Sequence, residues 1–169
     1  MQNMNQLDVN RICHYAPYKV WQDGKELRFE TEHDILYAVN FEPENSFGDI
    51  PSYWFGLFNR SQKASPNDVK IRATITCIIE EFFHANPHIL LYLCDNASEQ
   101  QAMRSRLFLR WFNAYANQQD YFIRTAVVKD EGEENHIAII VQRSHPKLQS
   151  IISTFDTIIQ QFNEGKPQD

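Results

Sequence analysis

Hydrophobic and polar residues alternate with a period of two in the first part of the chain, which is the pattern of β-strands with one buried face. The Asp23-Gly24 dipeptide supplies the positive φ angles that a tight hairpin needs. The polar, proline-containing segment after Phe41 predicts a loop. The pattern therefore predicts four strands, at Tyr18–Trp21, Glu26–Thr31, Ile35–Phe41 and Tyr53–Phe58.

The fourth predicted strand is unusually aromatic. Because neighbouring side chains of a strand point to opposite faces, its rings fall on both faces. They are Tyr53, Trp54, Phe55 and Phe58. This distribution predicts a strand covered on both sides, with the alternative that one face is an interface.

After Pro66 the hydrophobic period changes to the 3.6 residues of an amphipathic helix. Three helices are expected, at Asp68–His84, Ser98–Gln118 and Pro146–Asn163. Three further strands are expected, at Ile89–Cys94, Tyr121–Val128 and His136–Arg143, and the first is apolar enough for a central strand. The order ββββ-α-β-α-ββ-α predicts an α+β fold, a mostly antiparallel sheet with three amphipathic helices packed on it. We expect one domain over residues 1–169, with polar ends at 1–12 and 164–169.

Several charged residues fall on helix faces that should be apolar. At 100° per residue, Asp68 and Arg72 project inside the apolar arc of the first predicted helix, and Arg104 lies in the middle of the second arc. The strand that follows the first helix runs back far enough for Asp95 to emerge at the level of Asp68. We therefore expect these charges to converge with opposite partners, because an unpaired arginine on an apolar face is costly.

This predicted polar cluster has two interpretations. It is either an ion network that fixes the docking of the helices or a pocket for an anionic or polar ligand, which arginine side chains and helix amino termini both favour. Its candidate residues are Asp68, Arg72, Asp95, Arg104, Arg106 and Arg110.

Composition excludes several other functions. The net charge of -6, from 16 basic and 22 acidic residues, disfavours electrostatic capture of nucleic acid or membranes by the whole chain. The five glycines build no phosphate-binding loop, and His84 and His88 are separated by the helix-breaking Pro87. We therefore expect neither a cofactor nor a metal.

Cysteine usage and the start of the chain bear on the compartment. The first eleven residues contain no apolar leader, and the longest apolar run is too short to cross a membrane. The three cysteines are odd in number and form no CxxC pair, which favours reduced thiols. These features predict a cytoplasmic protein.

Three sequence motifs resemble those of a family of small, uncharacterised bacterial proteins, a domain of unknown function. The motifs are a helix start with Asp68, Ile71, Thr74 and Ile75, a strand end with Cys94 and Asp95, and a helix with Arg104, Arg106, Leu107, Phe108, Arg110, Trp111 and Phe112. The resemblance implies a bacterial, intracellular protein, and it carries no known activity.

Three functions remain open. The first is a non-enzymatic binding or regulatory module that acts through a protein partner or self-association, because the chain has no catalytic motif and an aromatic fourth strand. The second is a small enzyme or ligand-binding protein that uses the Asp/Arg cluster on a phosphate- or carboxylate-bearing ligand. The weakest is nucleic-acid association through Arg106 and Arg110 of the second predicted helix.

Overall fold

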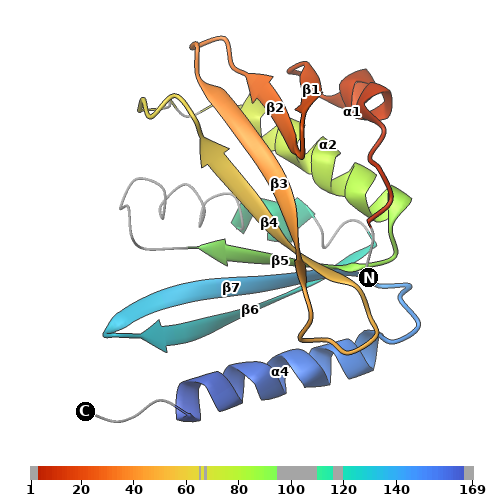
Figure 1. Cartoon of the computed structure of the whole chain (residues 1–169), viewed down its shortest axis with the longest axis vertical. Coiled ribbons are helices and arrows are strands. Elements are labelled where there is room, and N and C mark those ends of the chain that lie inside the picture. The colour runs from red at the N-terminus through yellow and green to blue at the C-terminus, as the bar shows by residue number, and fades with distance from the viewer. Residues whose placement is uncertain (1–3, 65, 67, 95–109, 116–119, 166–169) are drawn as a thin grey trace. The chain divides into compact units, whose positions relative to one another are not determined.

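The computed structural model describes residues 4–64, 66, 68–94, 110–115 and 120–165 (Figure 1). Its strands are hydrogen-bonded in the order β1-β2-β3-β4-β5-β7-β6, and the pairs β1/β2, β2/β3, β5/β7 and β6/β7 are antiparallel. This is the predicted α+β fold with a mostly antiparallel sheet. The elements are α1 (Val9–Tyr15), β1 (Val20–Asp23), β2 (Glu26–Glu30), β3 (Leu36–Glu44), β4 (Ser52–Asn59), α2 (Val69–Ala85), β5 (Ile89–Cys94), a helical segment at 110–115, β6 (Tyr121–Asp130), β7 (Glu133–Gln142) and α4 (Leu148–Glu164).

Backbone contacts divide the chain into two compact units, and each is described by itself. Unit 1 comprises Met1–Glu42 and Phe55–Pro87, and unit 2 comprises Pro43–Trp54 and His88–Asp169. The strands β3 and β4 contribute residues to both units. The expectation of one domain over the whole chain stays a prediction.

In unit 1, one face of the strands β1 to β4 packs against α2. Leu27 and Phe29 of β2 are buried, whereas Arg28 between them points to the other face. The core continues into the helix, because the ring of Phe41 stacks on that of Phe82 with 5.0 Å between the ring centroids. Alternation along the strands thus decides which side chains meet the helix.

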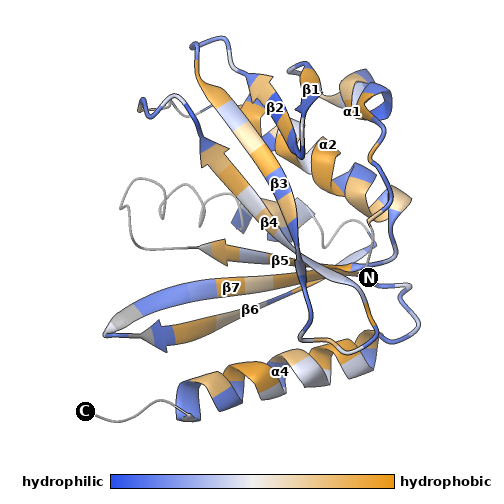
Figure 2. Cartoon of the chain, in the orientation of Figure 1, coloured by the Kyte–Doolittle hydropathy of each residue, from blue (hydrophilic) through white to orange (hydrophobic). Residues whose placement is uncertain are grey.

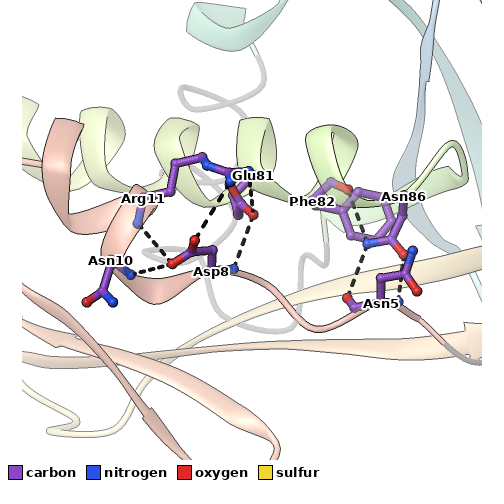
Figure 3. A network of polar contacts seen from close by, with 7 residues as sticks. All are labelled: Asn5, Asp8, Asn10, Arg11, Glu81, Phe82 and Asn86. Atoms are coloured by element: carbon purple, nitrogen blue, oxygen red, sulfur yellow. Dashed lines mark hydrogen bonds and ion pairs between the residues drawn. The ribbon is translucent and has the colours of Figure 1, made fainter.

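The amino-terminal segment contains a helix that the sequence pattern does not predict, α1, which begins at Val9. The Asp8 side chain caps this helix by accepting hydrogen bonds from the backbone of Asn10 and Arg11. The Asp8 amide donates to the buried carboxylate of Glu81 on α2, and Arg11 pairs with the same carboxylate at 3.4 Å (Figure 3). Ile12 is the one buried residue of α1. The local sequence therefore lacks the hydrophobic period that would predict a helix here.

A second contact fixes the amino-terminal segment to the end of α2, beside which α1 lies (Figures 1 and 3). The buried Asn86 side chain accepts from the Asn5 backbone at 2.7 Å and donates to the Asn5 carbonyl at 3.4 Å. It also donates to the Phe82 carbonyl at 3.2 Å. The side-chain amide of Asn86 therefore hydrogen-bonds both to the last turn of α2 and to the amino-terminal segment, which is distant in sequence.

In unit 2, α4 covers one face of the antiparallel strands. Ile151 and Phe155 of α4 are buried against side chains that include Leu91 of β5 and Ile139 of β7. Figure 2 shows hydrophobic and hydrophilic residues alternating along α4, as expected for a helix with one buried stripe. The β5 strand lies between β4 and β7, and its residues 89–92 are all buried, so the prediction of a central strand is confirmed.

Four strands, β3, β4, β6 and β7, are longer than predicted, and β7 and β3 show why. The β7 strand begins at Glu133, because Glu131 and Gly132 both take positive φ angles, 50° and 82°, and close a hairpin of two residues. The β3 strand continues through Pro43 to Glu44, so the loop before β4 is shorter than expected. In both strands the added residues are mostly polar. Backbone pairing with the neighbouring strand, and not the hydrophobicity of the side chains, therefore determines where the strand begins or ends.

Candidate functional site

The structure places three of the six predicted cluster residues. Asp68 precedes α2 and Arg72 lies one turn into it, both half-buried and both in unit 1. Arg110 is exposed in the helical segment 110–115 of unit 2. Asp95, Arg104 and Arg106 lie outside the described residues. The convergence of these charges therefore stays a prediction.

Asp68 is the N-cap of α2. Its Oδ1 accepts a hydrogen bond of 2.9 Å from the backbone N–H of Lys70. Its Oδ2 accepts from the hydroxyl of Tyr18, a residue 50 positions earlier in the chain. Each oxygen of this carboxylate therefore has a donor, one from α2 and one from Tyr18.

Tyr18 links the start of α2 to the turn between β2 and β3. Its ring is buried and stacks on Phe29, and its backbone N–H donates to Thr74 of α2 at 3.4 Å. Its hydroxyl donates to Asp68 and accepts from the backbone N–H of Glu32 at 3.4 Å. Burial, followed by the hydrogen bond to the Asp68 carboxylate, raises the pKa of the Tyr18 hydroxyl to about 12.

This raised pKa predicts a loss of stability in alkaline solution. The neutral Tyr18 hydroxyl is favoured in the folded chain, so its stabilising effect is complete below the unfolded pKa of about 10 and is lost as the pH rises towards about 12. We expect urea unfolding between these pH values to show a steeper loss of stability in the wild type than in Tyr18→Phe. Equal slopes for the two proteins would contradict the prediction.

The turn at residues 31–35 places two more polar side chains near Asp68. The hydroxyl of the buried Thr31 accepts from the backbone N–H groups of His33 and Ile35, at 3.2 and 3.3 Å. Asp34 takes a positive φ of 59°, which short polar side chains tolerate best after glycine. The turn leaves His33 and the neighbouring Glu32 exposed.

One ligand atom from each of Glu32, His33 and Asp68 lies within 4.8 Å of the other two. Lys70 is also close, since its Nζ lies 3.2 Å from Glu32 Oε2 and 5.9 Å from the centroid of the Tyr18 ring. We call these five residues the Asp68 cluster. Sequence reasoning found only Asp68, because Tyr18, Glu32 and His33 approach it through the pairing of β1, β2 and β3 and through the docking of α2. Lys70 is its neighbour in α2, but its contact with Glu32 depends on the same docking.

The fourth strand supplies a second candidate surface. Tyr53 and Phe55 are buried and Trp54 is half-buried, so the interpretation of a strand covered on both faces is confirmed for these residues. Trp54 also donates from its indole N–H to Glu44 at 2.7 Å. For Phe58 the interpretation is wrong, because 40% of its surface is exposed. It points away from Phe55 and from α2, since residues three apart in a strand face opposite sides.

Phe58 belongs to a group of side chains on the face of unit 1 opposite α2. We call this group the charged aromatic face: Trp21, Asp23, Glu26, Arg28, Glu30, Leu36, Phe58 and Arg60. The guanidinium of Arg60 lies 4.9 Å from the centroid of the Phe58 ring, a cation–π distance. A Cβ atom on Gly56 would lie 2.8 Å from the ring, so Phe58 rests directly on the glycine backbone.

The charges of this face form a chain of ion pairs. Arg28 pairs with Asp23 at 2.7 Å and with Glu26 at 3.0 Å, and Arg60 pairs with the other oxygen of Glu26. The guanidinium of Arg60, followed by that of Arg28, holds the pKa of the Glu26 carboxyl below its usual value. The two arginines therefore hold the Glu26 carboxylate in its ionised form between them.

Comparison with known proteins places much of the chain in a family. The model of a family of unknown function (DUF6169) matches residues 67–157, which include Asp68 and Arg72. The predicted resemblance to a domain of unknown function is thereby confirmed. No curated protein and no solved structure matches the chain. Within the described residues, every helix is too short or too polar to cross a bilayer.

Proposed function

We propose that this chain, which belongs to the family of unknown function, is a non-enzymatic binding module. The module pairs with a second copy of itself through the charged aromatic face. The observation that carries the proposal is the exposed Phe58 ring, which is held between Gly56 and the Arg60 guanidinium. Aromatic residues and arginine are enriched in protein interfaces and supply most of their binding energy.

The position of Phe58 lowers the cost of association. A side chain that is already ordered loses less conformational entropy when a partner covers it. The Gly56 backbone lies beneath the ring and Arg60 lies over it, so Phe58 is constrained before binding. Trp21 and Leu36, both half-buried on the same face, extend the apolar surface around it.

The charge balance of the face favours a second copy as the partner. Three acidic residues, Asp23, Glu26 and Glu30, are interspersed there with the two basic residues Arg28 and Arg60. An interface between identical chains related by a two-fold axis must be self-complementary. A patch with charges of both signs meets that condition, whereas a patch of one sign would repel its own copy.

We also place this module in the bacterial cytoplasm. The odd number of cysteines and the absence of CxxC spacing support a reducing compartment. The resemblance of the helix and strand motifs to uncharacterised bacterial proteins supports the bacterial source.

The proposal predicts that the wild-type chain is dimeric and that Phe58→Ser is monomeric at the same concentration. Removing the ring deletes the centre of the interface without touching the α2 side of the sheet. Sedimentation equilibrium from micromolar to millimolar chain concentrations measures the effect, for which we expect at least about a tenfold rise in the dimer dissociation constant.

Phe162→Ser is the matched control, because Phe162 is a phenylalanine of similar exposure, 44%, on α4. We expect its dissociation constant to equal that of the wild type. A wild-type chain that stays monomeric at millimolar concentration would overturn self-association. The proposal would also fail if Phe58→Ser and Phe162→Ser weakened the dimer equally.

A further inference from the structure

The Asp68 cluster contains a set of side chains that is typical of transition-metal sites. Glu32 and Asp68 offer carboxylate oxygens and His33 offers an imidazole nitrogen. One nitrogen and two oxygen donors suit borderline cations such as Zn²⁺, with water completing the coordination shell. We propose that Glu32, His33 and Asp68 bind a divalent transition-metal ion, and this inference is independent of the proposed dimer.

The three ligands come from two segments that the fold brings together. Glu32 and His33 follow β2, and Asp68 begins α2, 35 residues after His33 in the numbering of the chain. The three ligand atoms already lie within 4.8 Å of one another. Both exposed side chains need only rotate to reach a common ion, because the backbone of the turn is set by Thr31.

Asp68 is the ligand whose side chain is already held in place by hydrogen bonds. Its backbone conformation is set by the capping hydrogen bond to Lys70, and its Oδ2 is held by the hydroxyl of Tyr18. Outer hydrogen bonds of this kind orient a ligating carboxylate and are a regular part of metal sites. An ionised carboxylate has about four lone-pair positions, so the two donors leave room for an ion.

A cation is already attracted to the cluster. The ammonium group of Lys70 lies 3.2 Å from Glu32 Oε2 and above the Tyr18 ring. Lys70 is about half exposed, 48% for its side chain, so it can move into solvent when a metal ion takes its place. The lysine and the metal therefore compete for the Glu32 carboxylate, so removing the lysine charge should strengthen metal binding.

The test is a titration of the wild-type chain and four variants with Zn²⁺, followed by calorimetry. We expect one site that is weakened at least about tenfold in His33→Ala. His14→Ala is the matched control, because His14 is an exposed histidine of α1 in the same unit and lies outside the cluster, and it should leave the affinity unchanged. Lys70→Met should strengthen binding, because it removes the competing cation.

The opposite results would overturn the proposal. Equal affinities of the wild type and His33→Ala would show that Zn²⁺ binds elsewhere. Weaker binding in Lys70→Met would show that the ion does not displace the lysine from Glu32, which contradicts the proposed site. Glu32→Gln changes a second ligand of the proposed site. Because Glu32 lies in an exposed turn, we expect this variant to stay folded. Circular dichroism of each variant separates lost binding from lost structure, and Co²⁺ absorption spectra report the coordination geometry of the bound ion.

Discussion

Replacing Phe82 with alanine is expected to lower the free energy of unfolding by about 3–5 kcal/mol. Phe82 is fully buried on α2, where it stacks on Phe41 and meets Phe83 edge-on at 5.1 Å. Its removal takes away the ring that joins α2 to the third strand and leaves a cavity that the surrounding rings cannot fill. Urea unfolding followed by circular dichroism measures the change.

The same substitution at Phe162 is the control for this experiment. Phe162 is 44% exposed on α4, so truncating it should cost less than about 1 kcal/mol. Phe82→Leu keeps most of the buried volume and should lie between the two. A Phe82→Ala variant as stable as Phe162→Ala would contradict the assignment of Phe82 to the core.

The second large effect is expected for Asn86→Ala, which should lower the free energy of unfolding by about 1–3 kcal/mol. The variant removes one of the two donors to the Phe82 carbonyl, which keeps its bond from the backbone N–H of residue 86. It also leaves the backbone N–H and carbonyl of Asn5 without their amide partner. Because this amide holds the amino-terminal segment against α2, α1 should also open more often. Faster hydrogen exchange of the Ile12 amide, which bonds to Asp8 at 3.1 Å, reports that opening.

Asn5→Ala separates the two sides of this contact. It removes only the exposed bond from the Asn5 side chain to the Ala85 carbonyl, while the backbone of Asn5 still pairs with Asn86. We expect a loss below about 1 kcal/mol and unchanged exchange at Ile12. If Asn5→Ala had the larger effect, the buried amide would not be the anchor.

In the Asp68 cluster, the sequence alone predicts one residue and not its partners. The position of Asp68 at a helix start follows from local signals, since it precedes the first apolar residues of an amphipathic run. Its partners do not follow, because Tyr18 and Glu32 are more than 30 residues away and reach it through strand pairing. The expected partners Asp95 and Arg104 lie outside the described residues, so that part of the hypothesis stays a prediction.

The sequence by itself determined the elements whose periodicity is strong. The predicted strand Ile89–Cys94 has the observed bounds, and the first long helix differs by one residue at each end, because Asn86-Pro87 marks its stop locally. The tertiary structure decided the features that depend on contacts distant in sequence: α1 held by Glu81 and Asn86, Phe58 exposed over Gly56, and the turn of His33 beside Asp68. Local preferences can be read from neighbouring residues, whereas the energy of such contacts exists only after the chain has folded.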